Sequence, residues 1–492
     1  MTDARPQPNQ PLERFGDTVR RAVIWRSGSQ IVAQLVQWTA TFLVIRILSP
    51  SDYGLFAMTG VVLTFLNMLN GYGLASGLIR EPDVTERQVR QLFGMLLLLN
   101  GTLALAQLAL APVAAAYYRH PEVADLLRVQ ALLYLTTPFV ALPLALLSRR
   151  MDFRHQAKAN ILASVASAGT ALGGALAGWG VWTLVAAPIV LFAVRAVVMT
   201  IAARSLVWPL FDFRGAGHLA RYGGVMAASQ LFWFLQTQAD VFIAGRHMGA
   251  HLLGIYTTAL FLAQIFVSKV VPPLNEVAFS AYARLHGVEG DPLPRGFLRA
   301  VRVVMAVALP FYAGLAATAE PLVATMLGGK WAEVAPVVRL LALAMPFMTL
   351  QALLTPACDA RGKPGVGVRN GAVGAVLLAV AFLIGVRFGP IGLALGWVAA
   401  YPVYLFVSLG RALPVIGVSA RAVAESVLPA LLAALAMGAT VVLVDSVLPA
   451  LPAVGRLAVL VAVGVPAYAG WLFAFARPLL RELIAVARRQ AD

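Results

Sequence analysis

Charge and cysteine are both scarce in this chain, and each shortage excludes a class of protein. Charged residues make up 12% of the 492 positions, whereas soluble globular domains carry about 25%. The one cysteine, Cys358, excludes a disulfide framework and a thiolate metal cluster. The sequence is therefore neither that of a soluble globular domain nor that of a disulfide-stabilised one.

Motifs that bind nucleotides or carry out catalysis are also missing. The sequence has no HExxH, P-loop or GxSxG motif, and no Asp-x-Asp pair of the kind that a sugar-nucleotide transferase needs. We therefore expect a protein that is not an enzyme and does not hydrolyse ATP by itself. We also expect no cofactor and no metal site.

Apolar residues, by contrast, are abundant and run in long segments. They account for 60% of the chain, and the mean hydropathy is +0.80. A helix of about 20 apolar residues can cross the roughly 30 Å hydrocarbon core of a membrane. Segments of this length follow one another with short polar breaks, which predicts an all-α polytopic membrane protein with 14 transmembrane helices. The predicted spans are residues 24–47, 53–79, 92–116, 123–147, 157–178, 180–203, 221–245, 253–274, 297–319, 335–358, 366–387, 390–410, 422–447 and 453–476.

The basic residues predict how these spans are oriented. The net charge is +16, with 38 Lys and Arg against 22 Asp and Glu. If both termini are cytoplasmic and basic residues near the ends of spans are assigned to the adjoining segments, 28 of the Lys and Arg are assigned to cytoplasmic segments, six to outer segments and four to the interior of spans. This distribution obeys the positive-inside rule. We therefore assign the basic charge to topology and to anionic lipid headgroups rather than to nucleic acid. The first span is expected to act as its own insertion signal, since no cleavable signal peptide precedes it.

Residues 27–57 and 227–257 resemble each other at a constant offset of 200. The identical positions are Ser29, Gln30, Leu35, Phe42, Arg46 and Gly54, which recur as Ser229, Gln230, Leu235, Phe242, Arg246 and Gly254. Six predicted spans separate the copies, so both enter the membrane in the same direction and the repeat is parallel. Secondary transporters are commonly built from such repeats and place the substrate path between them.

The repeat predicts two pseudo-symmetric six-helix lobes plus two C-terminal helices. We expect an N-lobe over residues 1–203, a cytoplasmic linker over 204–220 and a C-lobe over 221–410. Spans 13 and 14 lie within 411–476, and residues 477–492 form a basic cytoplasmic tail that contains an interfacial amphipathic helix. Glycines at four-residue spacing predict close contact between helices; they are Gly169, Gly173, Gly392 and Gly396.

Polar residues recur on corresponding spans of the two copies. In span 1, Arg26, Gln30, Gln34, Gln37 and Thr41 share one helical face. Such a face is costly against lipid, so we expect it to meet protein or water. Comparable positions on spans 2, 7 and 8 are Asn67, Asn70, Gln236, Asp240, Gln264 and Lys269. We infer a water-filled cavity lined mainly by spans 1, 2, 7 and 8; the alternative is that these amides join neighbouring helices within each bundle.

Cations outnumber anions near this expected cavity. The candidate cations are Arg26, Arg46, Arg195, Arg246 and Lys269, and the candidate anions are Asp240 and Glu276. A positive lumen suits an anionic cargo such as a phosphate or pyrophosphate, which arginine binds bidentately. Alternatively, Arg26, Arg46 and Arg246 extend to the membrane interfaces. Asp240 could bind a coupling cation or proton, or pair with an arginine.

Four characteristic strings of residues lie at the ends of predicted spans. They are Leu48-Ser49-Pro50-Ser51-Asp52-Tyr53-Gly54-Leu55-Phe56-Ala57, Leu147-Ser148-Arg149-Arg150-Met151-Asp152-Phe153-Arg154, Gly178-Trp179-Gly180-Val181-Trp182-Thr183-Leu184-Val185 and Gly328-Gly329-Lys330-Trp331. Together they resemble bacterial polysaccharide exporters, the Wzx-type lipid-linked oligosaccharide flippases of the multidrug/oligosaccharidyl-lipid/polysaccharide (MOP) superfamily. The resemblance extends over nearly the whole chain.

The resemblance implies a 14-helix fold and transport by alternating access through a cationic cavity. It implies a cargo of undecaprenyl-pyrophosphate-linked oligosaccharide, moved from the cytoplasmic to the periplasmic leaflet of the bacterial inner membrane for exopolysaccharide, capsule or O-antigen assembly. Membrane lipids and polysaccharide polymerase and co-polymerase proteins are the implied partners. Superfamily members that flip the peptidoglycan precursor are similar in using basic residues on helix 1, where Arg26 is the matching position.

Two other functions remain open at this point. A cation-coupled drug or metabolite antiporter of the same superfamily would depend on Asp240 or Glu276. A membrane-embedded glycosyltransferase or polymerase would need a large outer loop or a catalytic carboxylate pair, and every predicted outer loop is short.

Overall fold

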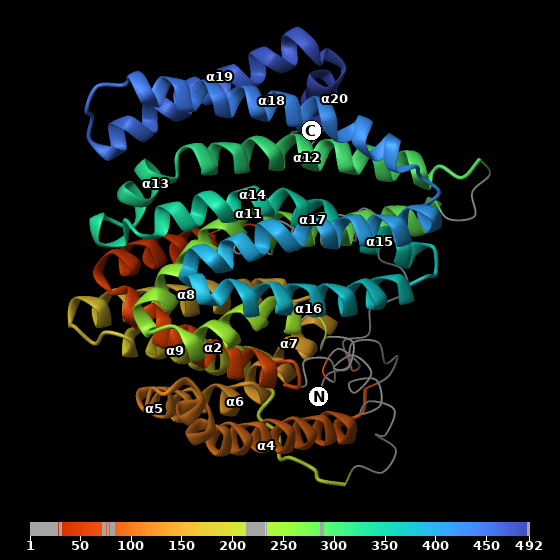
Figure 1. Ribbon diagram of the computed structural model, residues 1–492. Coiled ribbons are helices and arrows are strands. Elements are labelled where there is room, and N and C mark those ends of the chain that lie inside the picture. Colours follow the sequence, from red (N-terminus) through yellow and green to blue (C-terminus); the bar gives the residue numbers. More distant parts are fainter. Residues whose placement is uncertain are drawn as a thin grey trace. The chain divides into compact units, whose positions relative to one another are not determined.

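The computed structural model describes residues 28, 32–70, 75, 78, 84–212, 232, 234–285 and 290–489. These residues form helices and connecting turns, and none of them belongs to a β-strand (Figure 1). Among the residues that the structure describes, ten segments are long and apolar enough to cross a membrane, and a shorter apolar helix covers Val32–Ile47. The predicted all-α polytopic fold is therefore confirmed.

The chain divides into two compact units, Met1–Gln230 and Leu231–Asp492. Unit 1 begins, in its described part, with the helix Val32–Ile47. Its other helices are α2 (Pro50–Asn67), α4 (Glu86–Tyr118), α5 (Glu122–Gln130), α6 (Leu132–Thr136), α7 (Pro138–Arg149), α8 (Phe153–Leu176) and α9 (Trp182–Ala203). The three short helices α5, α6 and α7 together make one apolar segment, which runs from Glu122 to Arg149.

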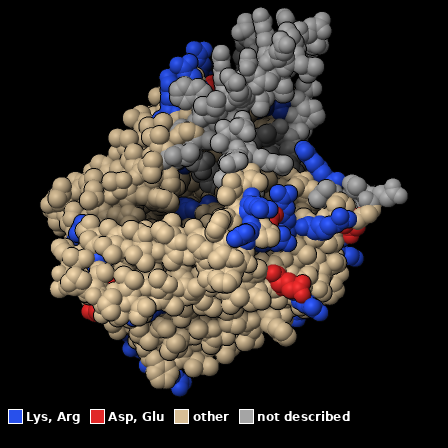
Figure 2. Space-filling view, turned by 90° about the horizontal axis from the view of Figure 1, so that it is seen from above, with Lys and Arg blue, Asp and Glu red and all other residues tan. Residues whose placement is uncertain are grey.

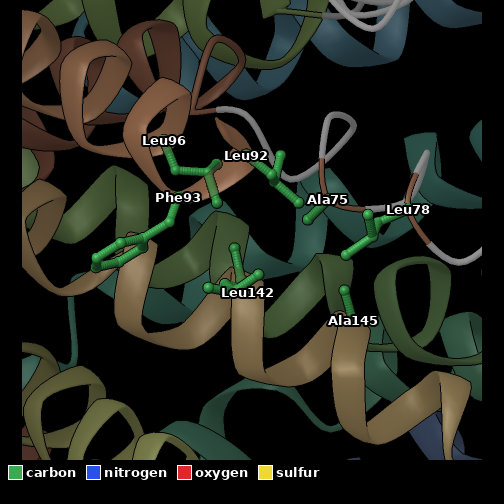
Figure 3. Close-up of a cluster of buried hydrophobic side chains, with 8 residues drawn as sticks. Ala75, Leu78, Leu92, Phe93, Leu96, Leu142 and Ala145 are labelled. Atoms are coloured by element: carbon green, nitrogen blue, oxygen red, sulfur yellow. The ribbon is translucent and has the colours of Figure 1, made fainter. Parts of the chain in front are cut away.

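A hydrophobic cluster in unit 1 joins α4 to α7. Leu92, Phe93 and Leu96 of α4 pack with Leu142 of α7, and all four are nearly fully buried (Figure 3). The α4 residues lie at positions i, i+1 and i+4, so they share one side of the helix. In a membrane, where lipid is as apolar as these side chains, close van der Waals packing of this kind holds α4 against α7.

Unit 2 contains the other helices that the structure describes. After a helical stretch over 234–247, its helices are α11 (Ala250–Leu285), α12 (Leu293–Ala317), α13 (Ala319–Met326), η1 (Gly329–Trp331), α14 (Val334–Ala352), α15 (Leu354–Ala360), α16 (Gly365–Gly385), η2 (Val386–Phe388), α17 (Gly389–Ile416), α18 (Ala420–Val447), α19 (Ala453–Phe475) and α20 (Arg477–Arg489). The predicted tail helix corresponds to α20. Glu482 of α20 binds Arg299 and Arg302 of α12 at 3.0 and 3.1 Å, and these ion pairs tie the tail to α12.

The repeat at an offset of 200 is visible in the backbone. One helix ends at Ile47 and the next begins at Pro50; in the second copy the helices end at His247 and begin at Ala250. The amide of Leu48 donates to the carbonyl of Val44 at 2.9 Å, and the amide of Met248 donates to the carbonyl of Ala244 at 2.8 Å. The two copies therefore make the same turn between successive helices.

The first two of the four resemblance strings form helix starts. Ser49 and Asp52 form a capping box at the start of α2, in which the Ser49 amide donates to Asp52 Oδ2 at 2.9 Å and the Asp52 amide donates to Ser49 Oγ at 3.3 Å. Asp152 accepts from the His155 amide at 3.2 Å and begins α8. Met151, just before it, has a φ of 55°.

The other two strings form turns that require glycine. Gly178 and Gly180, between α8 and α9, have φ values of 77° and 54°. Gly328, before η1, has a φ of 93°, and the Trp331 that follows is fully buried. Glycine adopts these angles without steric cost. These strings therefore specify the connections between helices.

Much of the surface is apolar, as expected for helices that face lipid. Leu105, Val376 and Phe406 are 68%, 66% and 79% exposed at positions within their apolar helices. Charged side chains occupy a small part of the face seen in Figure 2, where they gather in separate groups. This pattern suits a surface that is surrounded by hydrocarbon over most of its area.

Candidate functional site

A polar cavity lies within unit 1. It has a volume of about 520 Å³, and four helices line it. The lining residues are Ala33, Gln34 and Gln37 of Val32–Ile47, Val140 and Leu144 of α7, Phe153, Gln156, Ala157, Asn160 and Ser164 of α8, and Leu191, Phe192, Arg195 and Met199 of α9. This volume is in the range of small-molecule binding sites.

Helical periodicity places these side chains together. On α8, Gln156, Asn160 and Ser164 follow one another at intervals of four and form one polar stripe. On α9, Leu191, Arg195 and Met199 have the same spacing. The polar stripe of α8 and the arginine of α9 both reach the cavity because these two helices pack along each other.

Several amides in the cavity are available to a ligand. Within the part of the chain that the structure describes, Gln34, Gln37 and Asn160 make no hydrogen bond and are half-buried. Gln156 is more enclosed, and its Nε2 donates to Ser148 Oγ at 3.0 Å. An amide carries both donors and an acceptor, so this set can hydrogen-bond hydroxyl groups in either direction.

Arg195 is the positive group of this cavity. Its side chain is half-buried, and its guanidinium carbon lies 5.7 Å from the centre of the Phe192 ring, one turn earlier on α9. A cation over an aromatic face is held by the ring quadrupole. The cavity thus combines one oriented guanidinium with neutral polar groups, an arrangement that can bind a phosphate together with a hydroxyl-rich ligand.

The structure brings together only part of the predicted site within unit 1. Gln34, Gln37 and Arg195 line the same cavity. Arg46 is exposed one residue before its helix ends, and Asn67 is exposed near the end of α2. Asn70 lies elsewhere, where its carbonyl accepts from Asn100 Nδ2 at 3.0 Å. Two other predicted residues, Arg26 and Gln30, lie outside the described residues.

The sequence prediction missed the α8 side of the cavity. It expected a central cavity lined mainly by spans 1, 2, 7 and 8 and named no residue of α8, whereas α7, α8 and α9 supply most of the described residues around the cavity of unit 1. The sequence carries a signal for this side of the cavity, because Gln156, Asn160 and Ser164 are spaced at four residues and share one helical face, as Gln30, Gln34 and Gln37 do at spacings of four and three.

The predicted site residues of unit 2 occupy several different environments. Arg246 is exposed one residue before the end of the helical stretch 234–247, as Arg46 is in the first copy. Lys269 and Glu276 are exposed on α11, and Gln264 is half-buried there. Gln236 donates from Nε2 to the Phe232 carbonyl at 3.2 Å, which is a bond within its own helix.

Asp240 is fully buried and belongs to a hydrogen-bonded chain between helices. The Tyr256 hydroxyl of α11 donates to Asp240 Oδ2 at 2.6 Å, and Trp397 Nε1 of α17 donates to the Tyr256 oxygen at 2.7 Å. The Val241 amide donates to Asp240 Oδ1 at 2.8 Å. No ion pair to an arginine joins this chain in the described parts of unit 2. The side-chain partner of Asp240 among the described residues is thus a tyrosine, whereas pairing with an arginine was one of the two alternatives that the sequence left open.

Solved structures of other proteins share the fold of this chain. The structure titled "Lipid II flippase MurJ, inward closed conformation" has a TM-score of 0.76 at 12% identity, covering 93% of this chain and 100% of that one. The structure titled "Inward-facing conformation of a multidrug resistance MATE family transporter of the MOP superfamily" has a TM-score of 0.58 at 15% identity, covering 79% and 96%. The chain therefore has the fold of MOP-superfamily transporters.

The sequence then identifies the family. The chain belongs to the family described as polysaccharide biosynthesis protein, whose model matches residues 43–336. It is 29% identical to the succinoglycan biosynthesis transport protein ExoT of Rhizobium meliloti (strain 1021), over 76% of this chain and 75% of the relative. It is 23% identical to the lipopolysaccharide biosynthesis protein WzxC of Escherichia coli (strain K12), over 74% of each. The resemblance to polysaccharide exporters is confirmed.

Proposed function

We propose that this protein moves undecaprenyl-pyrophosphate-linked oligosaccharide repeat units across the bacterial inner membrane, from the cytoplasmic to the periplasmic leaflet. Transport occurs by alternating access and supplies exopolysaccharide, capsule or O-antigen assembly. The family and the transporter fold support this function. The observation that carries the proposal is the unit 1 cavity, in which Arg195 lies among amide and hydroxyl side chains.

The chemistry of the cavity matches the two parts of such a cargo. The guanidinium of Arg195 binds a pyrophosphate oxygen through charge-assisted hydrogen bonds. Gln34, Gln37, Asn160 and Ser164 exchange hydrogen bonds with sugar hydroxyls, for which amides serve as donors and as acceptors. None of these roles changes a covalent bond, so the proposal requires no catalytic group.

The orientation of the protein in the membrane is also part of this proposal. Both termini are cytoplasmic, because 28 of the 38 Lys and Arg then lie on the cytoplasmic side. The cavity would receive cargo made in the cytoplasm and release it toward the polymerase and co-polymerase proteins that extend the polymer. Anionic lipids of the inner leaflet are expected to bind the basic cytoplasmic loops.

The first test replaces Arg195 with alanine. A hydrogen bond to a charged group contributes about 1.5–3 kcal/mol, and 1.4 kcal/mol corresponds to a factor of ten. The Arg195→Ala variant should therefore bind lipid-linked oligosaccharide about ten-fold to a hundred-fold more weakly, and polysaccharide export should fall with it. Binding is measured on purified protein, and export is measured in a strain that lacks the chromosomal gene.

The control for this test is Arg128→Ala. Arg128 lies on α5, is exposed and pairs with Asp125 at 2.7 Å, so its removal changes the net charge equally without touching the cavity. Export by this variant should match that of the unsubstituted protein. Wild-type binding and export by Arg195→Ala would contradict the role of the cavity.

A cation-coupled drug or metabolite antiporter is the second candidate. The fold shared with the MATE transporter and the buried carboxylate of Asp240 favour it. This function predicts that deletion of the gene increases drug sensitivity and leaves surface polysaccharide intact. Loss of polymer with unchanged drug sensitivity would support the first function instead.

A further inference from the structure

Residues 205–212 form an extended strap that follows α9 and lies across the start of α4. The Leu210 amide donates to the Arg90 carbonyl at 3.0 Å, and Arg90 Nε donates to the Trp208 carbonyl at 3.0 Å. Gln91 Nε2 donates to the Asp212 carbonyl at 2.7 Å, and Arg87 pairs with the Asp212 carboxylate at 2.7 Å. The strap is thus bonded to α4 along most of its length.

One side of the strap is packed against unit 1. Ser205 is 4% exposed, and Val207 packs on the cluster between α4 and α7. At Gly94 of α4, an added Cβ would overlap the carbonyl of Leu210. The strap backbone therefore lies so close to α4 that glycine is required at this contact.

The other side of the strap presents large apolar side chains outward. Leu206, Trp208 and Phe211 are 77%, 83% and 54% exposed. Because the backbone is bonded to α4, these side chains cannot turn inward to bury themselves. Contiguous exposed apolar groups on a soluble surface mark an interaction site.

The position of the strap indicates what covers it. The strap follows Ala203, where the apolar helix α9 ends, and it contacts the first turns of α4, where another membrane-length helix begins at Glu86. Arginines surround it: Arg87 and Arg90 on α4, Arg204 at the end of α9, and Arg150, whose Nη1 donates to the Ala203 carbonyl at 3.3 Å. The carboxylates on these same segments are Glu86 and Asp212. Positive charge beside exposed apolar groups at the ends of two spans fits a bilayer with anionic lipids.

We propose that the strap anchors unit 1 to the membrane surface. Leu206, Trp208 and Phe211 enter the interfacial region of the leaflet at this end of α4 and α9. The neighbouring arginines bind the phosphates of anionic lipids. Since hydrogen bonds join the strap to α4, the lipid anchor and α4 move together. This role is independent of the cargo and of the proposed transport function.

Fluorescent labels attached to the strap test this anchor. Cys358 is the only cysteine of the chain, so a Cys358→Ala background allows single cysteines to be labelled with an environment-sensitive dye. Trp208→Cys and Leu206→Cys give two independent reporters on the strap. Leu105→Cys, in the middle of α4, reports the membrane interior, and Glu333→Cys, exposed before α14, reports water.

The labelled proteins are placed in nanodiscs of phosphatidylcholine with or without phosphatidylglycerol. Nitroxide lipids that carry the quencher near the headgroup should quench the strap labels at least two-fold more than those that carry it deep in the acyl chain. The Leu105 label should show the opposite order. Aqueous iodide should quench the Glu333 label at least two-fold more than the strap labels, and phosphatidylglycerol should increase the headgroup-level quenching.

Several outcomes would overturn the proposal. Strap labels that iodide quenches as strongly as the Glu333 label would place the strap in water. Labels shielded from both iodide and nitroxide lipids would mean that protein covers the strap. Equal quenching of the strap labels with and without phosphatidylglycerol would contradict the proposal that the neighbouring arginines bind anionic lipids. The Arg90→Ala substitution removes the hydrogen bond to the Trp208 carbonyl and so loosens the strap from α4. It should reduce the difference in quenching of the strap labels between headgroup-level and deep nitroxide lipids.

Discussion

Tyr256 illustrates how a single buried residue joins helices of unit 2. Its hydroxyl donates to Asp240 and accepts from Trp397, which lies on α17. All three side chains are at most 1% exposed. Buried polar groups are costly unless they are hydrogen-bonded. The Tyr256 hydroxyl supplies the hydrogen-bond partner that both Asp240 and Trp397 need.

The Tyr256→Phe substitution should destabilise the protein. It leaves an oxygen of the Asp240 carboxylate and the Trp397 indole N–H without partners, and each unsatisfied group costs about 1–3 kcal/mol. We expect a fall in Tm of several degrees for the purified protein, measured by thermal unfolding in detergent. The matched control is Tyr134→Phe, because the Tyr134 hydroxyl is buried without a hydrogen-bond partner among the described residues. Equal Tm values for the two variants would contradict the structural role of Tyr256.

At the scale of helices, glycine spacing proved to be an incomplete guide to close packing. The prediction was right for Gly392 and Gly396, where α17 contacts α16: an added Cβ at Gly392 would overlap the carbonyl of Gly385. It was wrong for Gly169 and Gly173 on α8, where an added Cβ meets no atom within 4 Å. Those two glycines are on the exposed side of α8, so no neighbouring helix approaches them.

Two alanine substitutions test this difference. Gly392→Ala should strongly lower the Tm, because the added methyl group overlaps backbone that cannot move as a side chain can. Gly173→Ala should leave the Tm unchanged or raise it, since alanine is favoured over glycine in a helix by about 0.5–1 kcal/mol. Thermal unfolding and the yield of folded protein in detergent measure both effects. A Gly392→Ala variant as stable as Gly173→Ala would rule out the close contact between α16 and α17.

The ends of the helices explain why the resemblance strings were recognisable. They contain the capping box of Ser49 and Asp52, the cap at Asp152 and the positive-φ glycines Gly178, Gly180 and Gly328. Turns of this kind require particular residues at particular positions, so they keep a readable pattern. The cavity residues lie in the middle of helices, where many polar residues can serve equally well.

For the whole molecule, the strongest sequence-based expectation concerns orientation. The alternating basic loops predict that the turn between α4 and α5 lies outside and that the start of α18 lies in the cytoplasm. Glu122 and Arg421 are exposed at these two places, with side chains 62% and 88% accessible. Each can carry a single cysteine in the Cys358→Ala background.

A membrane-impermeant maleimide tests this orientation in intact cells. Glu122→Cys should react from outside, whereas Arg421→Cys should react only after the membrane is permeabilised. Both variants should react equally in detergent, which controls for accessibility. Labelling of Arg421→Cys in intact cells would reverse or scramble the predicted topology.

The candidate site was only partly predictable. Gln34, Gln37 and Arg195 were expected to bind cargo, and they meet in one cavity. Asn67 and Asn70 do not line this cavity, whereas Gln156, Asn160 and Ser164 do. Helical periodicity shows which residues share a face of one helix. It does not show which neighbouring helix that face will meet.

The sequence by itself determined that this is a helical membrane protein with several spans. That property follows from the transfer free energy of each segment into lipid, which is a local sum along the chain. Only the tertiary structure decided that α8 and α9 complete a cavity, that a tyrosine rather than an arginine binds Asp240, and that a strap lies across α4. Each of these depends on contacts between residues far apart in the chain, and helix packing alone sets such contacts.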